Sequence, residues 1–273
     1  MAPPTPTTET PTEVAARIEA ELRAAGTPER AEQERRYLKS PLEHFGTSVP
    51  ATRKVAKGAG RLDHDDLIAV AEALWARPIH ECRAAAVELL DLHGAELGPA
   101  DLALIERLIR ESGTWALVDG LAASVAGPLV ERHPELLAEL DRWAADDDFW
   151  VRRSALLALL LALRRGEGDF ERFGAYADSM LEEREFFIRK AIGWVLRDTA
   201  KMRPDMVYAW LLPRAERASG LTRREAMKPM SAAQRATIVA AAQARSATRS
   251  GPRSRARRDD EPGPPERGAQ HPP

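Results

Sequence analysis

The stretch Arg152-Arg153-Ser154-Ala155-Leu156-Leu157 (152–157) decides the fold, because variants of it recur along the chain. Each variant carries basic residues followed by small or apolar ones. The other copies are Cys82-Arg83-Ala84-Ala85-Ala86-Val87 (82–87), Arg189-Lys190-Ala191-Ile192-Gly193-Trp194 (189–194) and Arg223-Arg224-Glu225-Ala226-Met227-Lys228 (223–228). The steps from Arg83 to Arg153, Lys190 and Arg224 are 70, 37 and 34 residues, and the first equals two periods of 35. The missing copy falls near Asp119. A period in the mid-thirties indicates stacked helix pairs.

The segments between these copies also favour helices. Ala, Leu, Arg and Glu dominate, Gly and Pro divide the chain into short pieces, and no segment has the β-branched alternation of a strand. We therefore predict an all-α fold, a HEAT-like α-solenoid of antiparallel helix pairs with a concave groove. Composition predicts disordered tails at 1–12 and at the Pro- and Arg-rich 244–273, with one repeat domain at 13–243 between them.

Composition also excludes several classes of protein. Cys82 is the only cysteine and the six histidines have no ligand spacing, so we expect no metal and no organic cofactor. No apolar run is long enough to span a membrane, and the N-terminus does not resemble a signal peptide, which predicts a cytoplasmic, chromosome-associated protein. No phosphate-binding glycine loop or serine–histidine motif is present. The formal net charge is −2, but basic residues cluster near 35–57 and 184–228, so one basic face is expected.

Equivalent positions of a solenoid stack along one face, so the repeat predicts a row of five side chains. The row consists of Arg83, Asp119, Arg153, Lys190 and Arg224. Four cations at regular intervals suit a DNA backbone, and these four are our predicted phosphate contacts. The alternative is a ladder in which charged side chains of neighbouring repeats pair with each other.

Asp119 is the exception in this row, and two tryptophans share its surroundings. Trp115 lies four residues before Asp119, and Trp194 lies four after Lys190, so each shares a helix face with the row. For either tryptophan taken alone, a position in the core is the favoured interpretation. Together, the row would gather one carboxylate, two indoles and several cations.

Four segments resemble the AlkD-type DNA alkylation repair family. Glu185–Lys201 contains the specific run Phe-Phe-Ile-Arg-Lys-Ala-Ile-Gly-Trp at 186–194, and three shorter pieces agree in order and spacing. They are Arg36-Tyr37-Leu38-Lys39, Trp115-Ala116-Leu117-Val118-Asp119 and Phe149-Trp150-Val151-Arg152-Arg153-Ser154-Ala155. The resemblance covers about 35–230. It departs at Thr114 and Ala116, where the family usually has Trp and Asp, which affects the expected substrate range and helix cap.

The resemblance implies a role for several residues. It implies that Asp119 is the catalytic carboxylate and that Trp115 and Trp194 contact the lesion-bearing nucleotide. It implies further that Arg153 contacts a phosphate beside the site and that Tyr37 is an N-terminal DNA contact. Family members are described as monomers that excise N3- and N7-alkylated purines without enclosing the base in a pocket.

The resulting prediction is a metal-free DNA glycosylase that acts on alkylated duplex DNA as a monomer. A non-catalytic DNA-binding solenoid and a protein-binding HEAT-like scaffold are the alternatives. Asp119 distinguishes the glycosylase from the non-catalytic DNA-binding solenoid, because a protein that only binds DNA has no need of an acid in a basic row. The scaffold predicts no salt-sensitive DNA binding.

Overall fold

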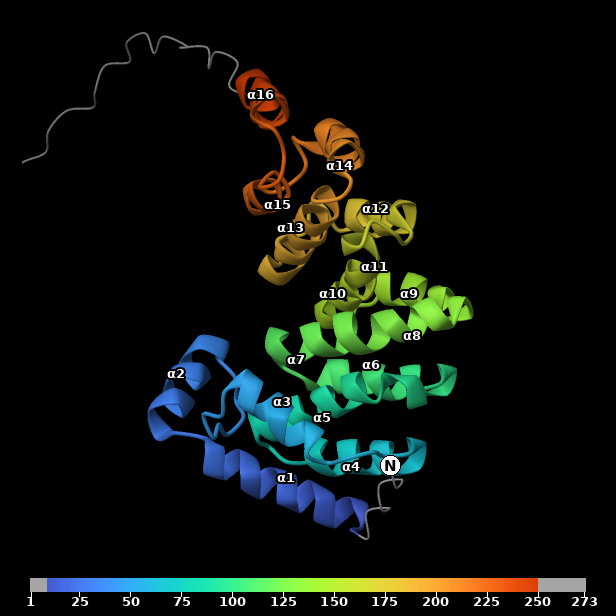
Figure 1. The fold of residues 1–273 in the computed structure, drawn as a ribbon. Coiled ribbons are helices and arrows are strands. Elements are labelled where there is room, and N and C mark those ends of the chain that lie inside the picture. Colours follow the sequence, from blue (N-terminus) through green and yellow to red (C-terminus); the bar gives the residue numbers. More distant parts are fainter. Residues whose placement is uncertain (1–8, 250–273) are drawn as a thin grey trace, which may run out of the picture.

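The computed structural model describes residues 9–249, and its regular elements in that range are helices joined by loops (Figure 1). The α-helices are α1 (Pro11–Ala25), α2 (Pro28–Leu38), α3 (Val49–Lys57), α4 (His64–Trp75), α5 (His80–Leu92), α6 (Leu102–Glu111), α7 (Trp115–Asp119), α8 (Gly127–Arg132), α9 (Leu137–Ala144), α10 (Phe149–Ala158), α11 (Leu160–Arg164), α12 (Phe170–Ser179), α13 (Phe186–Ala200), α14 (Pro204–Leu211), α15 (Gly220–Ala226) and α16 (Ala232–Arg249). A π-helix, η3 (Gly120–Ala126), joins α7 to α8. Short 3-10 turns complete the set: η1 (Gly94–Glu96), η2 (Pro99–Asp101), η4 (Pro134–Leu136) and η5 (Leu212–Arg214).

The all-α prediction is confirmed for the described residues. Their only β-type pairing is an isolated bridge between Glu43 and Ile79. Helix α1 begins at Pro11 and α16 continues to Arg249, so helix extends beyond both ends of the predicted repeat domain. The rest of the two predicted tails, 1–8 and 250–273, lies outside the described residues. Within 9–249, no helix combines the length and the hydropathy needed to cross a bilayer.

The helices stack in order along an arc, and one helix of each successive pair lies on its inner side (Figure 1). The inner helices are α5, α7 with η3, α10, α13 and α15. Their N-caps are Ile79, Thr114, Asp148, Glu185 and Ser219, which are 34 to 37 residues apart. The caps of α10, α13 and α15 accept a hydrogen bond from a first-turn amide, which fixes where each of these helices begins. These N-caps therefore define the repeat register.

A continuous apolar core runs between the inner and outer helices. Trp75 and Trp143 are buried in it, whereas Trp210 is only partly buried. Close backbone approach is needed where α13 packs on α15. A Cβ atom at Gly193 would lie 2.8 Å from the Glu225 Cβ and 3.1 Å from the Thr222 carbonyl oxygen. Glycine at 193 thus allows the last inner helices to pack closely.

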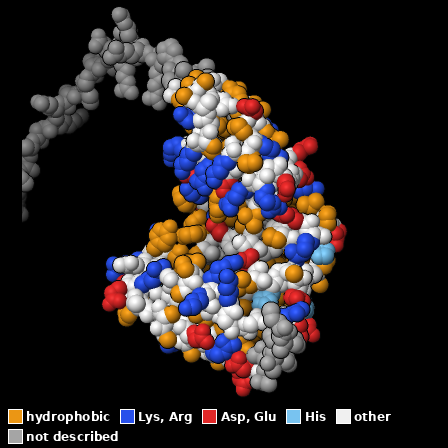
Figure 2. Space-filling model, viewed as in Figure 1, with side chains coloured by type: hydrophobic (Ala, Val, Ile, Leu, Met, Phe, Trp, Pro, Cys, Tyr) orange, Lys and Arg blue, Asp and Glu red, His pale blue; other side chains and the backbone are white. Residues whose placement is uncertain are grey.

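The arc leaves one side of the molecule hollowed. Figure 2 shows the hollow between the part of the surface over α2 and the part over α13 and α15. Lys and Arg side chains gather on the wall over α13 and α15, and hydrophobic side chains lie at the mouth. We call this hollow the groove.

Candidate active site and nucleic-acid interface

Counting from the N-caps shows which predicted residues occupy equivalent positions. Asp119, Arg153, Lys190 and Arg224 each lie five residues after the N-cap of their helix. Arg83 lies four residues after Ile79, so its alignment with Arg153 was wrong by one residue. The fifth position of α5 is Ala84. The row therefore has four charged members, and Arg83 is not one of them.

Arg83 belongs to a second row, at the fourth position, whose arginines donate hydrogen bonds to main-chain carbonyl groups. Its Nε and Nη1 atoms lie 3.1 and 2.9 Å from the carbonyl oxygens of Trp75 and Glu111. Arg152, Arg189 and Arg223 donate in the same way to the carbonyl groups of Asp146, Glu183 and Ala215, each at 2.6 Å. A helix or turn that ends leaves carbonyl groups without partners, and these arginines satisfy them. The geometry gives Arg83 a structural role and offers no support for its predicted contact with DNA.

Asp119 and Arg153 form a bidentate ion pair between neighbouring inner helices. Nε and Nη2 of Arg153 donate to the two Asp119 carboxylate oxygens, both at 2.8 Å. Nη1 donates to the Phe187 carbonyl oxygen at 2.5 Å. The Arg153 side chain is only 3% exposed, whereas that of Asp119 is 15% exposed. Arg153 therefore holds the Asp119 carboxylate in one orientation, with part of it open to solvent.

The surroundings of Asp119 affect both its pKa and its local backbone. Burial raises the pKa of the Asp119 carboxyl, while the hydrogen bonds and charge of Arg153 act in the opposite direction. The π-helix η3 begins at the next residue, Gly120. Local π-helical turns are frequent at functional sites because they redirect nearby side chains. Asp119 thus combines partial burial, a fixed orientation and an irregular backbone.

The other charged members of the row differ in how fully they are paired. The Lys190 ammonium lies 2.8 Å from a carboxylate oxygen of Glu225, which also pairs with Arg197 and Lys228. Arg224 is exposed, and within the described residues it makes no ion pair. Two of the predicted cations, Arg153 and Lys190, therefore pair with acids one repeat away, as the ladder alternative predicts. Arg224 remains available for a phosphate.

Trp115 of α7 lies beside Tyr37 of α2. The two rings meet edge to face with centroids 5.8 Å apart, and Tyr37 is 72% exposed. Behind them is a cavity of about 260 Å³ that Ala116 and His80 also line. Its charged lining consists of Glu34, Glu81 and Glu88, without any Lys or Arg. The cavity therefore favours cations and disfavours phosphate.

Trp194 has different neighbours from those of Trp115. Its indole N–H lies 3.2 Å from a carboxylate oxygen of Asp198, one turn along α13. Asp198 is buried, and it also pairs with Arg164 at 2.7 Å and with Lys201 at 2.8 Å. Burial acts to raise the pKa of Asp198, but these cations outweigh it and lower that pKa. Among the described residues, Trp194 makes no hydrogen bond to Asp119.

Three aromatic residues beside the Asp119–Arg153 pair were missed as site candidates. The rings of Trp150 and Phe187 have centroids 4.8 Å apart, and Phe149 stacks on Phe187 at 6.4 Å. The Arg153 guanidinium carbon lies 5.8 Å from the Phe187 ring centroid. Trp150 and Phe187 both stand two residues after an N-cap, so aromatic residues at equal positions of successive inner helices are the signal that could have identified them.

The two departures from the family pattern flank Trp115. Thr114 is the N-cap of α7, yet its side chain makes no capping hydrogen bond, and its buried hydroxyl has no partner among the described residues. Ala116 lines the acidic cavity. The substitutions therefore affect the start of α7 and the wall behind Trp115, and leave the Asp119–Arg153 pair intact.

Comparisons with known proteins agree with one another. A family model described as "DNA alkylation repair enzyme" matches residues 18–230. A solved structure titled "Predicted DNA alkylation repair enzyme from Enterococcus faecalis" is similar with a TM-score of 0.68 and 23% identity, covering 76% of this chain and 97% of that one. AlkD2 from Streptococcus mutans is similar with a TM-score of 0.57 and 17% identity, covering 80% and 98%. No curated protein matches the chain in sequence. At these identities the two structures bear on the fold alone.

Proposed function

We propose that this chain, which belongs to the DNA alkylation repair enzyme family, is a DNA glycosylase. Its proposed substrates are N3- and N7-alkylated purines in duplex DNA. The observation that carries the proposal is the Asp119 carboxylate, partly buried and held by two hydrogen bonds from Arg153. The basic wall over α13 and α15 supports DNA as the partner.

The chemistry of an alkylated purine suits such a site. The base carries a positive charge, so it leaves with the electrons of the bond to C1′ and becomes neutral. Positive charge then develops on the deoxyribose as an oxocarbenium ion, and water adds to C1′ and releases a proton to solvent. A fixed carboxylate stabilises this charge and orients the water. Asp119 has this role in the proposal, and Trp115 and Trp194 offer indole faces to the cationic nucleotide.

Arg153 positions Asp119, and two of its N–H bonds have no partner among the described residues. A guanidinium group has five N–H bonds, and Arg153 uses three of them with Asp119 and Phe187. In the proposal the remaining two donate to a backbone phosphate once DNA binding opens this side chain, which is 3% exposed in the free protein. Each Asp119 oxygen likewise keeps a lone pair free, because the bidentate pair uses one on each atom.

A non-catalytic DNA-binding solenoid is the second candidate. The observation that favours it is that Asp119–Arg153 and Lys190–Glu225 both join neighbouring repeats, as structural ladders do. The two candidates differ in what Asp119 contributes. A ladder residue affects folding, whereas a catalytic residue affects the rate in folded protein.

The deciding experiment compares release of 7-methylguanine from methylated duplex DNA by the wild type and Asp119→Asn. Asparagine keeps the size and one acceptor oxygen but removes the charge. We expect single-turnover release to fall roughly 10²-fold or more, with DNA binding retained. Glu106→Gln is the matched control, because it also removes an acid from an inter-repeat ion pair, on outer helix α6. It should lower the melting temperature and leave excision unchanged. Wild-type excision by folded Asp119→Asn would support the non-catalytic candidate.

A further inference from the structure

Helix α2 lies at the groove mouth without burying any of its residues. Most helices in proteins are stabilised by packing an apolar face against the rest of the molecule. The face of α2 that turns towards the molecule is only half-buried and includes Glu34 beside Ala31 and Leu38. Polar contacts therefore contribute to its attachment.

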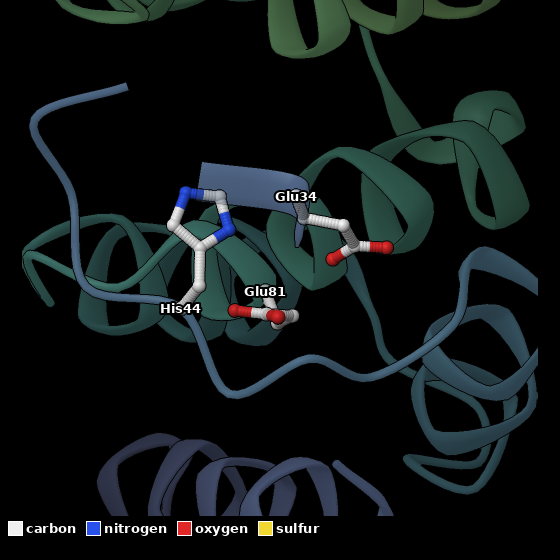
Figure 3. Close-up of side chains that lie close together, drawn as sticks. All are labelled: Glu34, His44 and Glu81. Carbon is white, nitrogen blue, oxygen red and sulfur yellow. The ribbon is translucent and has the colours of Figure 1, made fainter. Parts of the chain in front are cut away.

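One polar cluster joins α2 to the rest of the molecule. Glu34 of α2, His44 of the following loop and Glu81 of α5 come together, with one potential ligand atom from each lying within 4.8 Å of the others (Figure 3). The loop is anchored beside α5, since the Glu43 amide donates to Pro78 and the Glu43 carbonyl accepts from the His80 amide. Figure 3 shows the His44 ring above Glu81, with one ring nitrogen on the side of Glu34.

His44 has no protein partner for its ring within the described residues. It is only 8% exposed, and neither ring nitrogen makes a hydrogen bond. Buried polar groups normally have a partner. Burial lowers the pKa of His44, which keeps the ring neutral and leaves one nitrogen lone pair available.

The two carboxylates differ in how firmly they are held. Glu81 is 1% exposed and accepts hydrogen bonds from the amides of Phe45, Gly46 and Thr47 at 3.0, 2.6 and 3.2 Å. These bonds fix its orientation and leave lone-pair capacity, because a carboxylate has about four acceptor positions. Glu34 is partly buried and accepts from Arg30 on the same helix. It is the movable member of the cluster.

We propose that Glu34, His44 and Glu81 bind a divalent transition-metal ion that fastens α2 to α5. One imidazole nitrogen and two carboxylate oxygens form a donor set suited to Zn²⁺. Tetrahedral Zn²⁺ requires ligand atoms roughly 3.3–3.6 Å apart, so binding draws the cluster inward by about 1 Å. Glu34 and Glu81 also line the acidic cavity, which provides the entry path and room for a water ligand.

His80 supports this site without being a ligand. Its ring stacks on that of His44 with centroids 4.7 Å apart and planes 16° from parallel. A metal ion lies in the plane of the imidazole that binds it, so two stacked rings cannot share one ion. The expectation that this chain binds no metal rested on the spacing of histidines. Here the three donors come from separate segments, and no local spacing could reveal them.

The test uses purified full-length protein stripped with a chelator and then incubated with Zn²⁺. Bound zinc is counted by atomic emission after gel filtration, and the melting temperature is measured with and without the ion. Glu34→Gln and His44→Gln each remove one ligand and keep the side-chain size. Glu29→Gln is the control, because Glu29 is an exposed carboxylate on the same helix.

Wild type and Glu29→Gln should each retain one zinc ion per chain and melt several degrees higher with it. Glu34→Gln and His44→Gln should bind roughly 100-fold more weakly or worse and show no such rise, with unchanged far-ultraviolet circular dichroism. If His44→Gln does not fold, Glu34→Gln decides the question, because Glu34 lies on a helix without buried residues. Absence of zinc from the wild type, or equal binding by Glu34→Gln, would overturn the proposal.

Discussion

Arg153 makes three hydrogen bonds from a position that is almost fully buried, and two of them go to one carboxylate. A lysine at this position would keep the charge but could not hold both Asp119 oxygens, because an ammonium group acts as a point charge. The substitution Arg153→Lys therefore tests how Arg153 orients Asp119 while keeping the positive charge at position 153.

Arg153→Lys should lower the single-turnover rate about 10- to 100-fold, the cost of losing one charge-assisted hydrogen bond in the transition state. The apparent affinity for methylated DNA should change little, since the positive charge stays. Rates are compared per folded molecule, with the folded fraction taken from thermal melts. A variant that melts lower but keeps its wild-type rate would show that Arg153 is purely structural.

At the scale of the helix, α15 forms part of the basic wall of the groove (Figure 2). It carries Arg224, which makes no ion pair within the part of the chain that the structure describes. Arg224→Gln should weaken DNA binding because one phosphate contact is lost. The negative slope of the logarithm of the association constant against the logarithm of the salt concentration should become shallower by about one. Affinity measured at four or more salt concentrations gives this slope. Arg142→Gln, on outer helix α9, should leave it unchanged. An unaltered slope for Arg224→Gln would remove Arg224 from the interface.

The repeat was predictable from sequence, whereas its register was predictable only in part. Arg152-Arg153, Arg189-Lys190 and Arg223-Arg224 are basic pairs, while the copy at 82–87 has a single arginine that fits either position. N-cap spacing resolves the choice, because it places Arg83 with Arg152. The repeat allowed either a phosphate-binding row or a ladder of ion pairs, and local charge could not decide between them because each ladder partner lies about one repeat away. The acidic cavity behind Trp115 required three-dimensional packing and has no local signature.

At the scale of the whole molecule, ion pairs separated by 34–36 residues join successive repeats along the arc. They are Arg53–Glu88, Arg107–Glu72, Arg110–Asp146, Arg142–Glu106, Arg153–Asp119, Arg164–Asp198, Arg165–Glu131, Lys190–Glu225, Arg214–Asp178 and Arg217–Glu182. A single exposed pair contributes little to stability. Their repetition nevertheless makes the stack of repeats depend on carboxylates that stay charged.

Glu106 offers a test of this acid sensitivity. Burial acts to raise the pKa of Glu106, but hydrogen bonds from Arg142, Arg110 and Trp143 outweigh it and lower that pKa to about 2, from an ordinary value of 4.5. A lowered folded-state pKa stabilises the fold above about pH 4.5, and the stabilisation is lost as pH falls towards 2. Glu106→Gln should therefore melt lower than wild type at pH 7, and the difference should narrow as pH falls from 4.5 to 2. A difference that stays constant over this range would assign the effect to packing.

The bonds of Arg153 reach one repeat backward to Asp119 and one repeat forward to the Phe187 carbonyl, 34 residues away on each side. Repeat proteins evolve by gaining or losing whole units. A unit inserted between α7 and α10 would carry Asp119 out of reach, and one inserted between α10 and α13 would remove the Phe187 carbonyl. Whole repeats should therefore be gained or lost only outside the segment from Asp119 to Phe187, which is inherited as one block.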